Sequence, residues 1–135
     1  MAFFCPKRQA AGSYYLMSTR DHDDRPFDGS GTYHLNVLAD APVRQYWSAT
    51  AYDRETHGLI RNMNRASRSS QSPELQVNRD RSVDVYFGPT APSGNESNWV
   101  PTDAKRGFEV LFRFYGPEKS LFEKKWALPD LEKIG

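Results

Sequence analysis

The sequence predicts an all-β domain, a sandwich or a barrel, that ends in one short C-terminal helix. Two observations predict this fold class. Short runs of alternating apolar and polar residues are separated by clusters of Gly, Pro, Asn and Asp, the pattern of strands joined by turns. Aromatic residues make up 13% of the 135 residues, so the core is expected to be built from aromatic side chains more than from Leu and Ile.

Five runs alternate with period two, and each is expected to form a strand: 14–20, 32–38, 45–52, 83–87 and 108–115. The last run is the strongest, because every second residue from Phe108 to Phe114 is apolar. In the run 45–52, alternate residues from Trp47 to Ala51 share one face. In the run 32–38, His34 falls on the polar face.

One segment near the C-terminus has the pattern of a helix. Gly116-Pro117-Glu118 places a proline and then a carboxylate where a first helical turn accepts both. Leu121, Phe122 and Trp126 would then share one side, and Leu128-Pro129 would end the helix.

Length and charge limit the class of protein. A chain of 135 residues is expected to form a single domain, 1–135. The 18 basic and 17 acidic side chains give a net charge of +1, so neither a nucleic acid nor a membrane surface is expected as a partner. Cys5 is the one cysteine, and the N-terminus lacks the pattern of a signal peptide. We therefore expect a soluble, cytoplasmic protein without metal or cofactor.

Catalytic patterns are weak. Asp21-His22-Asp23-Asp24 has carboxylates that a cation could use, but acidic residues also suit a turn that bonds its own backbone. No serine stands in a GxSxG elbow. A hydrolase whose site converges only in the fold would draw on Asp53, His57 and Ser69 or Ser70, and no catalytic residue is assigned.

The aromatic side chains indicate a binding surface as the other candidate. They either fill the core or offer flat faces for ligand stacking, and Trp99 is the best exception to the core because it follows a polar loop. Asn98 is expected to cap loop backbone groups, with Trp99 anchored beneath. The predicted ligand-binding set, with aromatic groups to stack and charged groups to orient, is Trp99, Asn98, Tyr52, Asp53, Arg68 and Arg113.

Several blocks together resemble one family throughout the chain. They are YWSATAYDRETHGLIRN, RASRSSQSP, VDVYFGP, ESNWVPTD and GFEVLFRFYGPEK. The sequence is similar to the bacterial family called domain of unknown function 1214. The resemblance implies an antiparallel β-sandwich of jelly-roll type. It also implies a domain that in relatives usually forms the C-terminal part of a longer, often exported protein, behind domain of unknown function 1254. It carries no catalytic residue set.

Two positions depart from the family pattern. Similar sequences tend to have glycine where this chain has Asp24 and Arg81. Both positions are expected in hairpin turns, where a backbone with positive φ favours glycine. Asp28-Gly29 is likewise expected to form a tight turn that uses the freedom of the glycine.

Three hypotheses for function follow. The first is a non-catalytic module that binds a small molecule or carbohydrate, or docks another domain. The alternative is a small metal-independent hydrolase. The third, compatible with either, is self-association as a homodimer, or docking onto an N-terminal partner domain, through Phe3, Phe4, Tyr14 and the Leu121–Trp126 face.

Overall fold

The computed structural model describes residues 3–4, 13–39, 43–55, 67–70, 75–94, 96–117, 128–129 and 131–134. Within these residues the elements are β1 (Phe3–Phe4), β2 (Ser13–Ser18), β3 (Tyr33–Val37), β4 (Val43–Asp53), β5 (Ser67–Ser69), β6 (Val83–Gly88), the 3₁₀ turn η1 (Glu96–Asn98), β7 (Trp99–Pro101), β8 (Phe108–Pro117) and β9 (Glu132–Lys133). The five expected strands are confirmed as β2, β3, β4, β6 and β8.

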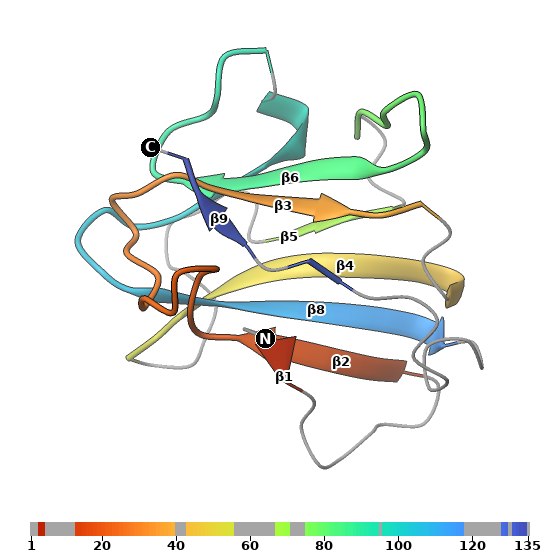
Figure 1. The fold of residues 1–135 in the computed structure, drawn as a ribbon, viewed down its shortest axis with the longest axis horizontal. Coiled ribbons are helices and arrows are strands. Elements are labelled where there is room, and N and C mark those ends of the chain that lie inside the picture. Colours follow the sequence, from red (N-terminus) through yellow and green to blue (C-terminus); the bar gives the residue numbers. More distant parts are fainter. Residues whose placement is uncertain are drawn as a thin grey trace.

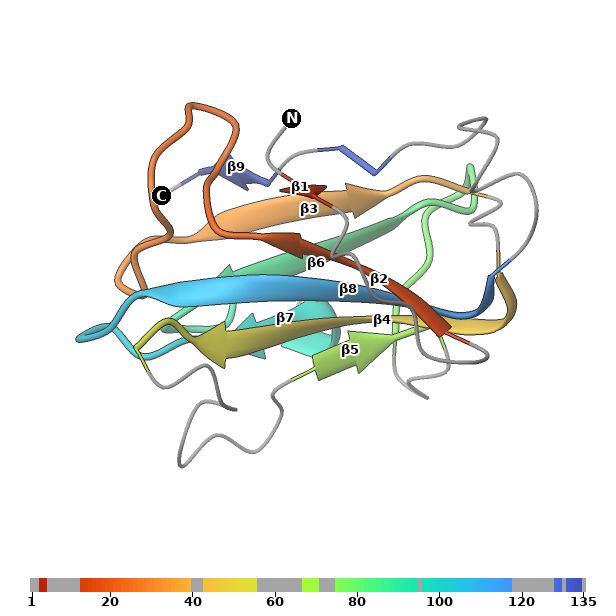
Figure 2. The same cartoon turned by 90° about the horizontal axis from the view of Figure 1, so that it is seen from below.

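The strands form two sheets, in the orders β1-β2-β8-β4-β5 and β7-β6-β3-β9. The longer strands of both sheets run along the long axis of the molecule (Figure 1). From below, β2, β8, β4 and β5 lie side by side in that order (Figure 2). One expectation needs correction, because β6 and β7 pair in parallel and the four-stranded sheet is therefore mixed.

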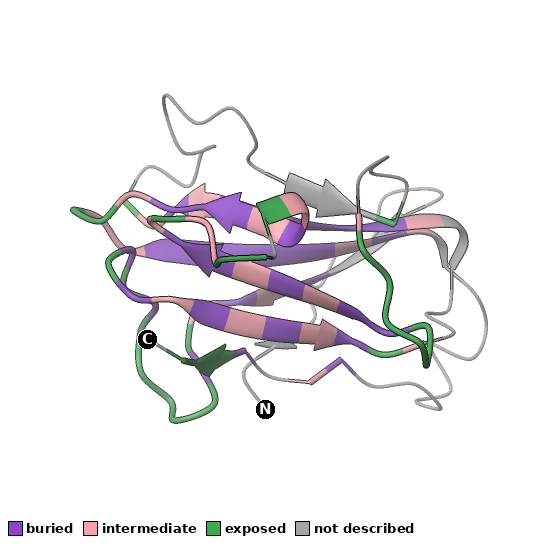
Figure 3. Ribbon diagram, turned by 90° about the horizontal axis from the view of Figure 1, so that it is seen from above, coloured by how far each residue is buried: buried purple, intermediate pink, exposed green. Residues whose placement is uncertain are grey.

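The core lies between the two sheets. Buried and half-buried residues alternate along the strands (Figure 3), as period-two side chains require when one face is covered. The face of β4 expected in the core is buried, with Trp47 5% exposed. Phe108 of β8 stacks on Phe27 at a centroid distance of 4.9 Å and meets the ring of Tyr33 in β3 edge-on at 5.4 Å. We call these three residues and Phe87 of β6, 6.2 Å from Phe108, the aromatic joint, since they tie one sheet to the other.

Two turns have the same hydrogen-bonding pattern, one between β2 and β3 and one directly before β6. In each, the first residue donates its N–H to the carbonyl four residues on, and the fourth donates to the carbonyl of the first, at Asp21–Arg25 and at Asn78–Ser82. The fourth residue has positive φ in both, 61° for Asp24 and 70° for Arg81. This is the geometry of a type I turn followed by a left-handed residue, where glycine is favoured. The expectation for both positions is confirmed.

Gly29 serves a different purpose from the one expected. Its φ is not positive, but an added Cβ would lie 1.8 Å from the carbonyl oxygen of Asp103 and 2.4 Å from that of Arg106. Glycine is therefore required at position 29 because two backbone segments touch there.

Two further expectations can be placed. The expected start of the C-terminal helix is wrong, because Gly116 and Pro117 belong to β8, which continues through Pro117. The rest of the expected helix, residues 118–127, lies outside the described part. No helix among the described residues has the length and apolar character needed to cross a bilayer.

We predict that Arg81→Gly raises the melting temperature by about 2–5 °C, because a non-glycine residue at positive φ costs about 1 kcal/mol. Thermal unfolding followed by circular dichroism measures the change. Arg79→Gly, in the same turn but without positive φ, is the matched control and should lower the melting temperature. A decrease for Arg81→Gly would show that the left-handed backbone is not a source of strain.

Candidate functional site

A network of polar side chains centres on Asp84, which lies on the outer face of the four-stranded sheet. Asp84 Oδ1 is hydrogen-bonded to His34 Nε2 at 2.6 Å and to Asn36 Nδ2 at 2.9 Å. Its other oxygen accepts from Asn78 Nδ2 at 3.0 Å. The carboxylate is therefore held by donors from β3 and from the turn before β6, and only about a quarter of each of the His34 and Asp84 side chains is exposed (26% and 29%).

These donors set the charge of the site. Burial alone would raise the pKa of Asp84, but the hydrogen bonds from His34, Asn36 and Asn78 outweigh it and hold the pKa below its ordinary value. Asp84 is thus an oriented carboxylate at neutral pH. Burial, with the nearby Asp84 charge, raises the pKa of the Tyr86 hydroxyl. Tyr86 therefore presents a neutral phenol there.

Strand register places a row of side chains across this same face. Glu132 of β9 pairs with His34 of β3, His34 with Tyr86 of β6, and Tyr86 with Trp99 of β7. Paired residues project to the same side of a sheet. The rings of His34 and Tyr86 are 5.2 Å apart and tilted by 35°. We call His34, Tyr86 and Trp99 the aromatic row.

Asn98 and Trp99 are fixed by hydrogen bonds. Asn98 is 3% exposed and donates to the carbonyls of Gln76 and Asp84 at 2.9 and 2.8 Å, while it accepts from the Gln76 N–H at 2.8 Å. The expected cap is confirmed. Trp99 Nε1 donates to the Gly88 carbonyl at 2.9 Å, and the residue stays half-buried. The Trp99 ring is therefore oriented without being taken into the core.

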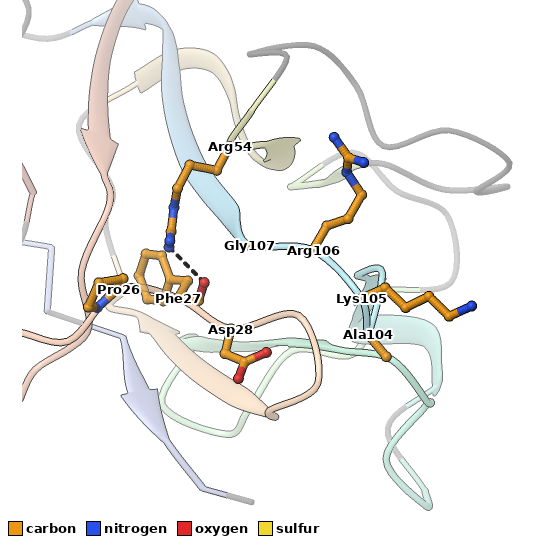
Figure 4. A pocket seen from close by; sticks show the side chains of 8 residues that line it. All are labelled: Pro26, Phe27, Asp28, Arg54, Ala104, Lys105, Arg106 and Gly107. Carbon is orange, nitrogen blue, oxygen red and sulfur yellow. Dashed lines mark hydrogen bonds between the residues drawn. The ribbon is translucent and has the colours of Figure 1, made fainter.

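A second feature lies where the loops around Phe27, Arg54 and Arg106 meet. An open hollow of about 370 Å³ is lined there by Pro26, Phe27, Asp28, Arg54, Ala104, Lys105, Arg106 and Gly107 (Figure 4). Beside it, Arg106 Nε is hydrogen-bonded to Asp53, and Arg106 Nη2 lies 3.1 Å from Glu55. The bond to Asp53 raises the pKa of Arg106. The carboxylate of Asp53 is thus bound by an arginine of the loop that precedes β8.

The predicted ligand-binding residues lie in three places. Trp99 begins β7 of the four-stranded sheet and Asn98 ends the 3₁₀ turn directly before it, whereas Asp53 lies beside the hollow at the end of β4. Tyr52 of β4 pairs with Glu109, on the outer face of the five-stranded sheet. Arg113 of β8 pairs with Ser48 of β4, whereas Arg68 of β5 pairs with Ala49, the next residue of β4. The register positions of the two arginines along β4 therefore differ by one residue. The set does not form one cluster.

The residues considered for catalysis are engaged in local structure where they are described. Asp21 Oδ1 accepts from the N–H groups of Asp23 and Arg25 at 2.9 and 3.0 Å, the expected backbone-bonding turn. Ser70 Oγ accepts from the Trp47 N–H at 3.1 Å. His57, and the side chain of Ser69, lie outside the described part. Among the residues that the structure places, no three His, Cys, Asp or Glu side chains are grouped to hold a metal ion.

Sequence reasoning missed most of the site. It placed His34 on a polar strand face but not beside Asp84, 50 residues further along the chain. It also gave no role to Tyr86, Arg54 or Arg106. The apolar–polar alternation of β3 and β6 predicted which residues lie on the polar face of each strand. It did not predict that the two strands pair, because pairing depends on the order of the strands in the sheet.

Fold and site together define a two-layer β protein with a polar and aromatic outer face and a ligand-sized hollow among its loops. A family model described as "Protein of unknown function (DUF1214)" matches residues 12–119, and the chain belongs to this family. The comparison with curated proteins gives no match.

Two crystal structures have a similar fold. One is a protein from Vibrio parahaemolyticus, with a TM-score of 0.79 and 23% identity over 92% of this chain. The other is an uncharacterised protein from Burkholderia cenocepacia, with a TM-score of 0.67 and 15% identity over 98% of this chain. The chain spans about a third of each, 31% and 34% of their lengths. At these identities the likeness is one of fold.

We predict that Asp84→Asn lowers the free energy of unfolding at pH 7 by about 1–3 kcal/mol, since three donors lose their carboxylate. The pKa of Asp84 is lowered in the folded state, so its contribution is complete above the ordinary value of 3.8 and is lost as the pH falls through the folded-state value. Wild type and variant should therefore converge in urea unfolding as the pH is lowered from about 5 to about 2.

The matched control is Asp23→Asn, which removes an exposed charge from the other turn and should show no such convergence. A difference between wild type and Asp84→Asn that is constant over this pH range would contradict the assigned role of the carboxylate.

Proposed function

We propose that this protein is a non-catalytic module that binds a carbohydrate across the outer face of its four-stranded sheet. The observation that carries the proposal is the register that sets Trp99, Tyr86 and His34 side by side on a half-buried face. Two strand spacings give a row about 10 Å long. That length suits two adjoining sugar rings, whose C–H faces stack on aromatic groups.

Polar groups beside the row supply orientation. The Asp84 carboxylate accepts three hydrogen bonds and keeps lone-pair capacity, and Asn36 stands next to it on β3. A sugar hydroxyl donates to such a carboxylate without the cost of reorganising it, because Asp84 is already fixed. Stacking groups and fixed hydrogen-bonding groups on one rigid face favour binding over chemistry.

The hydrolase alternative has less support. Of its suspects, Asp53 is hydrogen-bonded to Arg106, and the Ser70 hydroxyl accepts from the backbone N–H of Trp47. Hydrolysis of ester and glycoside substrates, lost on His57→Ala with the fold intact, would establish it.

Finer features of architecture and assembly are part of the proposal. Successive long strands β2, β3, β4, β6 and β8 alternate between the two sheets, which supports a β-sandwich of jelly-roll type. We propose a single domain with a short C-terminal helix. The greater length of the two solved structures supports docking onto another domain. Homodimer formation and a cytoplasmic location also remain proposals.

We predict that Tyr86→Ala weakens oligosaccharide binding at least about tenfold, since it removes the central ring of the row. Isothermal titration calorimetry with cellotetraose, maltotetraose, xylotetraose and chitotetraose measures it. Tyr46→Ala is the matched control, because Tyr46 stacks on Tyr115 in the other sheet at 4.2 Å and should leave binding unchanged. Absence of binding to all four sugars, or equal loss in both variants, would overturn the proposal.

A further inference from the structure

The hollow among the loops is large enough to hold a small molecule. Its volume of about 370 Å³ falls within the range of small-molecule sites, roughly 300–1,000 Å³. Pro26 and the buried Phe27 line one side of it, while Asp28, Arg54 and Lys105 bring charge to its rim (Figure 4). None of these residues belongs to the aromatic row.

The walls are held rigidly by backbone contacts. Asp28 and Gly107 form an isolated antiparallel bridge, and the N–H of Gly29 donates to the Arg106 carbonyl at 3.0 Å. The N–H of Arg54 donates to the Gly107 carbonyl at 3.2 Å. Behind these loops, Phe27 is stacked in the aromatic joint. The hollow is therefore preformed, which lowers the entropic cost of binding.

Arg54 and Arg106 differ in what they bind. Arg106 is paired with Asp53 and Glu55, and in Figure 4 its side chain extends away from that of Arg54. Arg54 Nη2 donates to the Phe27 carbonyl at 2.7 Å, which fixes the guanidinium in place. Within the described residues, no carboxylate lies at ion-pair distance from Arg54. Its remaining N–H groups can bind a ligand carboxylate in the fork geometry that guanidinium favours.

Asp28 brings the opposite charge to the same hollow. Its Oδ1 accepts from the backbone N–H and the hydroxyl of Ser30 at 2.9 and 2.8 Å, which orients the carboxylate. Asp28 and Arg54 line one hollow but do not pair with each other, and Lys105 adds a second, exposed cation. A purely anionic ligand would be repelled by Asp28, whereas a ligand with a carboxylate and a hydrogen-bond donor satisfies both groups.

We propose that this hollow binds a small carboxylate that also carries a hydroxyl or ammonium group, with the carboxylate on Arg54 and the donor on Asp28. This site is separate from the aromatic row and does not depend on the proposed carbohydrate binding.

The test is a titration with L-lactate, followed by the backbone amide signals of Asp28, Gly29 and Gly107 in ¹⁵N NMR spectra. Saturable shifts are expected, with a dissociation constant of about 1 mM. Lactamide, which lacks the carboxylate, should give none. Propionate, which lacks the hydroxyl, should bind the wild type about threefold more weakly than lactate does. Asp28→Asn should bind propionate and lactate equally well.

Arg54→Gln should weaken lactate binding at least about tenfold, whereas Arg79→Gln, at an exposed arginine of the turn before β6, and Tyr86→Ala should not change it. Lys105→Gln, at an exposed side chain outside the aromatic joint, provides a second variant whose folding is not at risk, with an expected loss of about threefold. The proposal is overturned by the absence of saturable shifts up to about 50 mM lactate. It is equally overturned by comparable binding of lactamide, or by unchanged binding in a folded Arg54→Gln or in Lys105→Gln.

Discussion

The register between β3 and β6 is the constraint on which the rest of the structure depends. It sets Tyr33 opposite Phe87 and Leu35 opposite Val85, so that both strands bury one face in the core. Because side chains alternate with a period of two, the same register sets His34 beside Tyr86 and Asn36 beside Asp84 on the other face. A slip of one residue would exchange core and surface throughout the sheet. Burial of the core thus fixes the geometry of the outer face, and the parallel pairing of β7 extends it to Trp99.

The aromatic joint has a corresponding effect at the loop end. Phe108 begins β8, and its ring meets Phe27 from the loop and Tyr33 from the other sheet. The Tyr33 hydroxyl then accepts from the Asp28 N–H at 3.0 Å, so the buried joint is bonded directly to a wall of the hollow. The close approach at Gly29 holds the same loop against the segment around Arg106. Rigid packing beneath exposed charges is an arrangement that suits recognition of a small ligand.

How far the sequence could predict this structure depended on how local each signal was. Alternation located the five main strands. Asp24 and Arg81 were placed correctly through the family resemblance, because similar sequences tend to have glycine at both turn positions. The site was harder to predict, because Asp84 meets His34 across 50 positions and Arg106 meets Asp53 across 53. Such meetings depend on the order of strands in a sheet, which alternation does not specify. Gly29 shows the same limit, since its requirement comes from a distant backbone rather than from its own turn.

The central claim is that core register presents His34, Tyr86 and Trp99 as one ligand-binding face. Mapping ¹⁵N chemical-shift changes during titration with the best-binding oligosaccharide tests it most directly. The account predicts changes concentrated on β3, β6 and β7, at these three residues and around Asp84, with β4 and β8 unaffected. Changes concentrated around Tyr46 and Tyr115 on the five-stranded sheet, or scattered over both sheets without saturation, would contradict it.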